Sequence, residues 1–169
     1  VTVNGVSKAW AMTGWRLGYI GASKQIADAC NKIQGQFTSG TSSITQRAAI
    51  AAMDADPGVL KEMVETFHKR RDLVLSYLNK IPGVKCNVPT GAFYLFPDVS
   101  TYFGTKDGDQ LIQDGDDLCM YLLREGNIAL VDGKGFGAPN CIRISYAASE
   151  EQLIKAMERL TAALAKLSR

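Results

Sequence analysis

The segment from residue 1 to residue 23 carries only two charged side chains, Lys8 and Arg16. Both are cations, and they lie among apolar and aromatic residues, including two tryptophans. Burying an unpaired cation is costly, so we expect these side chains to face an anion that the segment itself does not contain. The alternation in "WRLGYIG" predicts a strand, and "TVNGV" predicts another before the loop that carries Lys8.

Helical periodicity follows this strand–loop–strand segment. Residues 24–37 predict a short helix capped by Ser23. The polar stretch "TSGTSS" predicts a hinge, and Ser43 with Gln46 predicts a capping box that opens the next helix. Pro57-Gly58 interrupts it, and a longer helix then continues until it stops near Pro82-Gly83.

Beyond this point the apolar period changes to that of strands. "VKCNV", the turn "PTG" and "AFYLFPD" predict a β-hairpin, "NIALV" a buried strand and "CIRISYA" another strand. Residues 98–116 predict mostly loop, and "DGKGFGAPN" a glycine-rich loop. "DLCMYLLREG" predicts a helix, and Ser149 with Gln152 predicts the cap of a final helix.

The resulting order from about residue 43 is α, α, β, β, α, β, β, α. This order predicts a two-layer α+β domain, in which helices pack on one side of a small antiparallel or mixed sheet. The first 40 residues fit this domain poorly. We therefore expect two domains, with residues 1–40 as the last pieces of another domain and residues 41–169 as a small C-terminal domain.

Composition excludes several classes of function. The net charge of +2 and the absence of a basic stripe argue against nucleic-acid binding, and no apolar run reaches the ~20 residues of a membrane span. The four cysteines are scattered and the chain has one histidine, His68, so we expect no metal site and reduced thiols in a cytoplasmic protein. The first residues show no signal peptide. Because the chain lacks an initiator methionine and starts directly in a predicted strand, we expect it to be a piece of a longer protein.

Lys8 and Arg16 together suggest a particular ligand. A desolvated lysine near a second cation has a lowered pKa and can attack a carbonyl, whereas a planar guanidinium suits a phosphate. Pyridoxal 5'-phosphate offers both an aldehyde and a phosphate. The alternative is a structural lysine whose ammonium reaches water along its apolar stem.

The stretch "SKAWAMTGWRLGY" resembles the cofactor-lysine signature of the class I/II aminotransferases, which are fold-type-I pyridoxal-phosphate enzymes. It is most like their bacterial aspartate aminotransferase branch. The pattern Ser-Lys, spacer, Thr-Gly-x-Arg-x-Gly is matched at Ser7, Lys8, Thr13, Gly14, Arg16 and Gly18. "TSGTSSITQRAAIAAM", "PTGAFYLFPD" and "CIRISYA" resemble later parts of the same family, so the resemblance extends over essentially the whole chain.

The resemblance implies roles for Lys8, Arg16 and Arg143, and the positions of Ser7 and Phe136 make these two residues further candidates. Lys8 is expected to form the Schiff base with pyridoxal 5'-phosphate and to move the substrate proton. Arg16 and Ser7 are expected to bind the cofactor phosphate. Arg143 is expected to pair bidentately with the substrate α-carboxylate, and Phe136 to line the substrate side of the site.

The expected function is then transamination between an amino acid, with aspartate favoured, and a 2-oxo acid, with 2-oxoglutarate favoured. The resemblance also implies a homodimer and a large N-terminal domain outside this chain, without which we expect the chain to be inactive. Asp132 departs from the proline that many relatives have there, which leaves the shape of the following loop open.

Three other functions remain compatible with the sequence. A fold-type-I lyase or synthase would share Lys8, Arg16 and Arg143 but would eliminate or cyclise its substrate. An aminotransferase-like sensor domain of a transcription regulator would bind the cofactor without turnover. A small domain that serves only in protein association would need neither the cofactor nor turnover.

Overall fold

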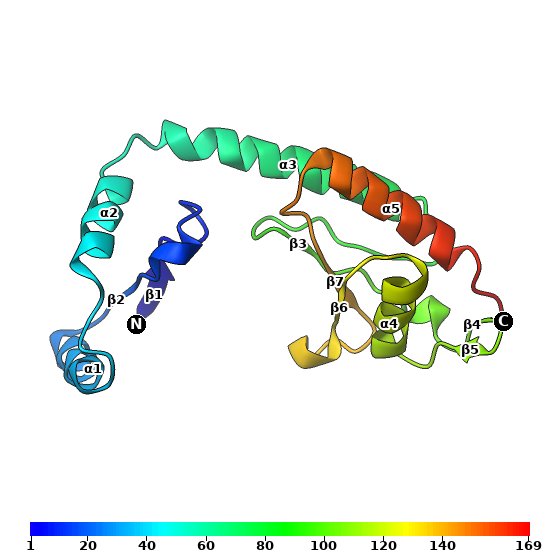
Figure 1. Cartoon of the computed structure of the whole chain (residues 1–169), viewed down its shortest axis with the longest axis horizontal. Helices are drawn as coiled ribbons and strands as arrows, with labels where there is room; N and C mark the ends of the chain where they lie inside the picture. The colour runs from blue at the N-terminus through cyan, green and yellow to red at the C-terminus, as the bar shows by residue number, and fades with distance from the viewer. The chain divides into compact units, whose positions relative to one another are not determined.

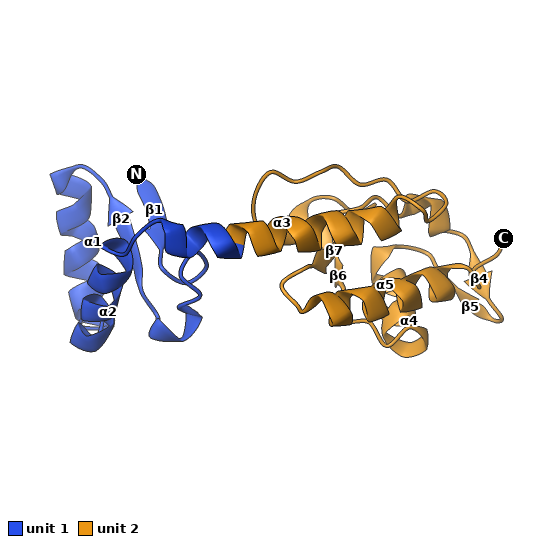
Figure 2. Cartoon of the chain, turned by 90° about the horizontal axis from the view of Figure 1, so that it is seen from above, with its two compact units in different colours: residues 1–63 blue, residues 64–169 orange.

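The structure, a computed structural model, describes residues 1–169 and shows two compact units (Figure 2). Unit 1 comprises residues 1–63 and unit 2 comprises residues 64–169. The division falls inside helix α3 (Gly58–Leu78), beyond the hinge expected near residue 40. The expected boundary at 40/41 concerns the domains of a longer protein and stays a prediction. None of the helices combines the length and apolar composition that a bilayer span requires.

Unit 1 begins with the predicted strand–loop–strand. Strands β1 (Thr2–Gly5) and β2 (Gly18–Gly21) pair antiparallel, and a 3₁₀ turn, η1 (Thr13–Trp15), interrupts the loop between them. Helix α1 (Lys24–Phe37) follows, as its periodicity predicts. Ser23 occupies its N-cap position, but the serine side chain makes no capping hydrogen bond.

Helix α2 (Ser43–Met53) begins one residue earlier than the capping box requires. Ser42 is the N-cap residue, so Ser43 already belongs to the first helical turn. The side-chain amide of Gln46 donates instead to the carbonyl oxygen of Thr41, at 2.8 Å. The predicted Ser43–Gln46 capping box is therefore wrong, although the helix itself is confirmed.

Unit 2 contains an antiparallel sheet with the strand order β3 (Tyr94–Leu95), β7 (Ile142–Ser145), β6 (Val131–Asp132). A separate two-stranded ladder joins β4 (Lys106–Asp107) to β5 (Gln110–Leu111), and two further 3₁₀ turns, η2 (Ser100–Tyr102) and η3 (Lys134–Phe136), lie in loops. The helices of the unit are its part of α3, α4 (Gly115–Glu125) and α5 (Glu150–Leu164). In both Figure 1 and Figure 2, α5 runs beside this part of α3. The predicted α+β class is confirmed.

One hydrophobic core joins these elements. Its fully buried side chains come from all three helices and from β3 and β7, and include Val74, Leu78, Leu95, Leu118, Tyr121, Leu122, Ile142, Met157 and Leu160.

Two side-chain caps fix where helices begin. Asp114 accepts from the backbone N–H groups of Asp116 and Asp117, and Ser149 accepts from that of Gln152, as its sequence predicts.

Two predicted strand elements are wrong in detail. The expected hairpin of residues 84–98 is reduced to one bridge, Lys85 with Asp98, because β3 pairs with β7 instead. In "NIALV" only Val131 is part of a strand, while Ile128 packs in the core from an irregular segment. Both errors follow from reading local apolar patterns without the distant partner strand, β7.

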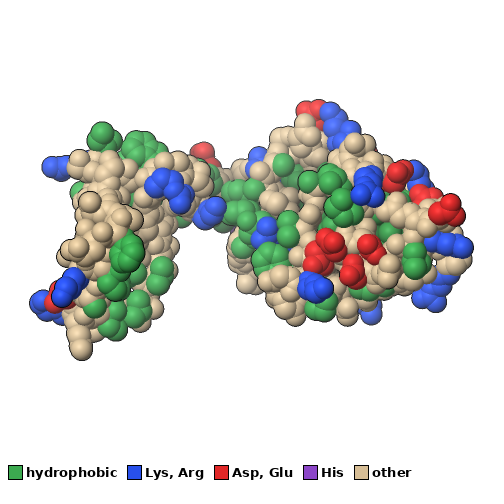
Figure 3. Space-filling view, turned by 60° about the horizontal axis from the view of Figure 1, so that its bottom comes forward, with side chains coloured by type: hydrophobic (Ala, Val, Ile, Leu, Met, Phe, Trp, Pro, Cys, Tyr) green, Lys and Arg blue, Asp and Glu red, His purple; other side chains and the backbone are tan.

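On the face drawn in Figure 3, both units expose apolar side chains, and unit 2 mixes these with acidic and basic ones. On α1 the exposed apolar residues are Ile26, Ile33 and Phe37, and Phe37 is 83% exposed. Only Val6, Thr45 and Ala49 of unit 1 are buried.

Candidate functional site

The loop between β1 and β2 starts and ends at a close approach of two glycines. Gly5 pairs with Gly18 across the ladder. A Cβ atom added to Gly5 would lie 2.9 Å from the carbonyl oxygen of Leu17 and 3.3 Å from the Cα of Gly18. A side chain at position 5 would therefore force the two strands apart.

Ser7 and Arg16 line one hollow at this junction, together with Asn4, Gly5, Leu17 and Gly18. The hollow has a volume of about 350 Å³ and opens to solvent. Arg16 adopts a left-handed backbone conformation, with φ of 52° and ψ of 55°, and its guanidinium donates to the carbonyl oxygen of Thr13 at 3.1 Å. For a residue with a side chain this conformation costs about 1 kcal/mol, and such strain concentrates at functional sites.

Lys8 directly follows Ser7 in the same loop, but it is not among the residues that line the hollow. The side chains of Lys8, Arg16 and Trp15 are exposed. Val6 is the one buried residue of this loop, with 1% of its surface exposed. The loop is thus anchored by Val6 and presents its cations outward.

The donor set of the hollow fits a phosphate. Ser7 and Arg16 line it, the Gly5–Gly18 approach leaves room beside the backbone, and no acidic residue lines it. A planar guanidinium beside a hydroxyl can donate several charge-assisted hydrogen bonds to one phosphate.

Unit 2 carries Arg143, on the central strand β7. Side chains alternate along this strand, so Ile142 and Ile144 enter the core while Arg143 and Ser145 lie on the other face. Arg143 is half-buried, pairs across the ladder with Val131, and takes part in none of the ion pairs of the chain.

Two aromatic rings contact the Arg143 guanidinium. Its central carbon lies 4.5 Å from the centroid of the Tyr94 ring and 4.7 Å from that of Phe136. Phe136 also meets Phe96 edge-to-face, with centroids 6.0 Å apart. The structure therefore brings Arg143 and Phe136 together, as it does Ser7 and Arg16 in unit 1.

The loop after β6 delivers Phe136 to this position. The Asp132 carboxylate accepts from the backbone N–H of Lys134 at 2.9 Å and so starts the short turn that contains Phe136. A Cβ atom at Gly133 would lie 2.3 Å from the carbonyl oxygen of Ala138 and 2.4 Å from that of Cys141. Asp132 and Gly133 together define the loop whose shape the sequence leaves open.

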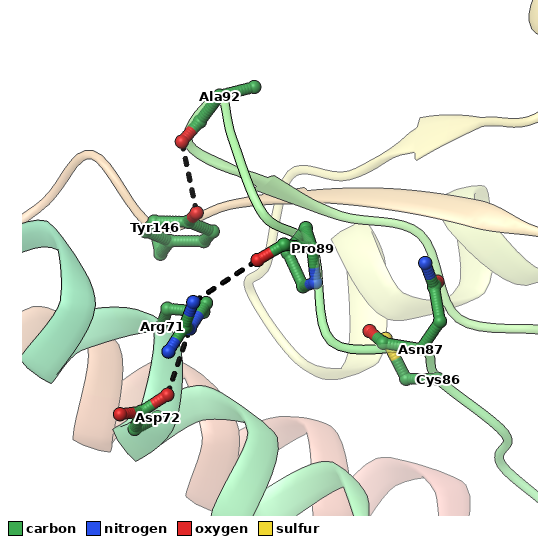
Figure 4. A network of polar contacts seen from close by, with 7 residues as sticks. All are labelled: Arg71, Asp72, Cys86, Asn87, Pro89, Ala92 and Tyr146. Atoms are coloured by element: carbon green, nitrogen blue, oxygen red, sulfur yellow. Dashed lines mark hydrogen bonds and ion pairs between the residues drawn. The ribbon is translucent and has the colours of Figure 1, made fainter.

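The loop before β3 is tied down from two sides, as Figure 4 shows. Arg71 on α3 donates to the carbonyl oxygen of Pro89 at 3.1 Å, and its Nε lies 2.8 Å from the Asp72 carboxylate. Tyr146, just after β7, donates to the carbonyl oxygen of Ala92 at 3.0 Å. These contacts fix the segment that leads into Tyr94.

The cysteines are free thiols, and none joins the candidate site. Burial raises the pKa of Cys119 to about 12 and raises the pKa of Cys86 and of Cys141 above the usual value. Such thiols are poor nucleophiles near neutral pH, since the thiolate is the reactive form. No group of histidine, cysteine and carboxylate side chains could hold a metal ion.

Sequence reasoning missed Tyr94 and Phe96. Their alternate positions in "AFYLF" place them on one face of a strand, which is a usable signal. The pairing with β7 that brings this face against Arg143 is not visible in the local pattern.

Unit 2 thus carries an arginine whose surroundings suit a carboxylate, and unit 1 carries a hollow whose lining suits a phosphate. The sequence profile of the family "Aminotransferase class I and II" matches residues 1–160. The chain belongs to this family, whose aspartate aminotransferases use pyridoxal 5'-phosphate.

Individual relatives agree with the profile. The chain is 52% identical, over 168 residues, to the bifunctional aspartate aminotransferase and glutamate/aspartate-prephenate aminotransferase of Petunia hybrida, covering 97% of this chain and 35% of that protein. It is 47% identical to an aspartate aminotransferase of Rhizobium meliloti, covering 99% of this chain and 41% of the relative. The chain thus spans well under half the length of these relatives.

A solved structure extends the similarity to the fold. The crystal structure of the aspartate aminotransferase from Rhizobium meliloti superposes with a TM-score of 0.95 at 46% identity. The match covers 99% of this chain and 42% of that one.

Proposed function

We propose that the complete enzyme containing this sequence is a pyridoxal-phosphate-dependent aminotransferase that moves an amino group between aspartate and 2-oxoglutarate. The observation that carries the proposal is Arg143, a half-buried guanidinium with aromatic contacts and no ion pair in the chain. Such a group is suited to a ligand carboxylate. The names of the relatives favour aspartate as the amino donor.

Each candidate residue has a physical role in this proposal. Ser7 and Arg16 bind the cofactor phosphate in the hollow that they line. Lys8 supplies the amine that attaches the cofactor and, once released, carries a proton at the substrate Cα. Arg143 binds the α-carboxylate and so sets the orientation of the Cα–H bond, which contributes to rate through positioning. Phe136 excludes water from one side of the guanidinium.

The cofactor, when bound, supplies the electron sink that stabilises negative charge at the substrate Cα. The group that pairs with its ring nitrogen is not assigned to this chain. We therefore expect the 169 residues alone to be inactive. The proposal also includes residues 1–40 as part of the large domain, residues 41–169 as the small domain, a homodimer and a cytoplasmic location.

The test is an assay of the complete enzyme with aspartate and 2-oxoglutarate, which should release oxaloacetate. Lys8→Ala should reduce kcat at least about 1,000-fold, because both the attachment point and the proton carrier are lost. Borohydride treatment should fix the cofactor to Lys8, as peptide mass spectrometry would reveal. Normal turnover of the Lys8→Ala variant would contradict the assignment.

A second acceptor follows from the names of the relatives. The Petunia protein also acts on prephenate by name, so prephenate is tested beside 2-oxoglutarate. Release of ammonia from the amino acid without consumption of the 2-oxo acid would instead favour a lyase. Turnover by the 169-residue chain with added cofactor would contradict the expected inactivity.

A further inference from the structure

The ring of Tyr94 contacts the Arg143 guanidinium more closely than that of Phe136 does. We propose that Tyr94 is a positioning residue, which holds the plane of the Arg143 guanidinium so that its N–H edge meets the substrate carboxylate. This inference rests on the proposed function, since it takes Arg143 as the carboxylate-binding residue. Tyr94 and Phe136, whose rings both contact the guanidinium, form an aromatic clamp.

The strand register places Tyr94 where it can act on Arg143. Tyr94 pairs with Ser145, and Leu95 pairs with Ile144, so Arg143 lies diagonally across the ladder from Tyr94. Diagonal neighbours on one face of an antiparallel pair are within reach of aromatic and long side chains. Tyr94 is therefore held at the diagonal position to Arg143 by backbone pairing rather than by a flexible loop.

The contact leaves the donors of Arg143 available. A cation–π contact uses the flat face of the guanidinium, whereas hydrogen bonds to a carboxylate use its edge. The Arg143 guanidinium takes part in no ion pair of the chain. The clamp thus restricts the rotation of the side chain without occupying the group that would bind a ligand, which lowers the entropy lost on binding.

The elements that carry the two rings are themselves fixed. The Arg71 and Tyr146 hydrogen bonds hold the loop that leads into Tyr94 (Figure 4). Phe96, on the same face of the segment, packs edge-to-face against Phe136 at an interplanar angle of 89°. The two halves of the clamp are therefore connected through Phe96.

The experiment compares Tyr94→Leu with Tyr94→Phe in the complete enzyme. Tyr94→Leu removes the ring and should raise both the KM for aspartate and the Kd for maleate, a dicarboxylate without an amino group, by about 3- to 30-fold. The affinity for pyridoxal phosphate should stay unchanged, because the substitution alters the carboxylate site and leaves Ser7 and Arg16 intact. Tyr94→Phe keeps the ring and should stay within about 2-fold of wild type.

Tyr77 provides a matched control. Its ring also contacts a cation, Lys80 at 5.7 Å, and it packs partly against the core of unit 2. Tyr77→Leu should leave the Kd for maleate unchanged. A Tyr94→Leu variant that binds maleate like wild type, or a loss that Tyr77→Leu shares, would overturn the inference.

The two proposals can fail separately. If Tyr94→Leu weakens maleate binding as expected but the enzyme transfers no amino group, the proposed function is refuted and the role of the aromatic clamp is supported. An active transaminase in which Tyr94→Leu changes neither KM nor maleate affinity refutes the clamp alone. If Arg143→Gln leaves maleate binding unchanged, the clamp is refuted, because Arg143 then does not hold the carboxylate.

Discussion

The hydroxyl of Tyr146 donates a 3.0 Å hydrogen bond to the carbonyl oxygen of Ala92, and so connects the end of β7 to the loop before β3. Tyr146 is buried, with 2% of its surface exposed, and its ring also packs edge-to-face on Phe67 of α3. One side chain thus joins three segments that are far apart in the sequence.

Tyr146→Phe should lower the free energy of unfolding by about 1 kcal/mol, because Ala92 loses its donor while the ring stays in place. Burial raises the pKa of Tyr146, so the folded state favours the protonated phenol. The stabilisation is complete below the unfolded pKa of about 10 and declines as the pH rises above it. Urea unfolding should show that the difference in the free energy of unfolding between variant and wild type is smaller at pH 10.5 than at pH 7. The same difference at both pH values would contradict this account.

Gly133 is required by the loop that carries Phe136. Gly133→Ala would place a Cβ atom 2.3 Å from the carbonyl oxygen of Ala138, so the backbone must move. We expect a loss of stability of about 2 kcal/mol and weaker maleate binding by the complete enzyme. Gly135→Ala is the control, since no atom lies within 4 Å of its added Cβ. Equal behaviour of the two variants in thermal unfolding and calorimetry would refute the role of Gly133.

Two substitutions at Arg16 distinguish its role in cofactor binding from the cost of its left-handed backbone conformation. Arg16→Ala and Arg16→Gly both remove the guanidinium and should both weaken phosphate-cofactor binding by the complete enzyme. Arg16→Gly should be the more stable of the two by about 1 kcal/mol, because glycine adopts the left-handed conformation at no steric cost. Urea unfolding of the matched pair measures this difference, and an alanine variant of equal or greater stability would show that the strain is absent.

Asp98 should make the stability of unit 2 sensitive to acid. Hydrogen bonds from the Ser100 side chain and backbone hold the pKa of the Asp98 carboxyl below its usual range. Its stabilising effect is therefore present above the unfolded pKa of about 3.9 and is lost as the pH falls through the lower, folded value. Asp98→Asn should have a lower free energy of unfolding than wild type at pH 7, and the two values should converge near pH 2. Chemical unfolding that gives the same difference at both pH values would contradict this expectation.

Much of the fold follows from local patterns. Helices α3 and α5 are predictable because long amphipathic repeats need no distant partner, and the Ser149 cap is a local signal. The hairpin assigned to residues 84–98 is wrong because the strand signal of Tyr94 and Leu95 is real but its partner, β7, lies far along the chain. A short apolar run such as "NIALV" does not distinguish a strand from other buried backbone.

The candidate site shows the same limit. Lys8, Arg16 and Arg143 stand out because their residue types match a signature with fixed spacing. The role of Tyr94 depends on a diagonal neighbour in the ladder, which no spacing along the chain encodes. The exposure of Lys8 and Arg16 could not be predicted from the sequence either, since burial depends on which segments cover the loop.

The alternation of Ile142, Arg143, Ile144 and Ser145 along β7 has a consequence for folding errors. Shifting the strand by one residue would turn Arg143 toward the core and both isoleucines toward water. A strand of only a few residues has little other means of resisting such a slip. Arg143, which we assign to ligand binding, therefore also disfavours the shifted pairing of β7, because that pairing would bury its charge. Replacing Arg143 by an apolar residue should allow the sheet to adopt more than one strand register.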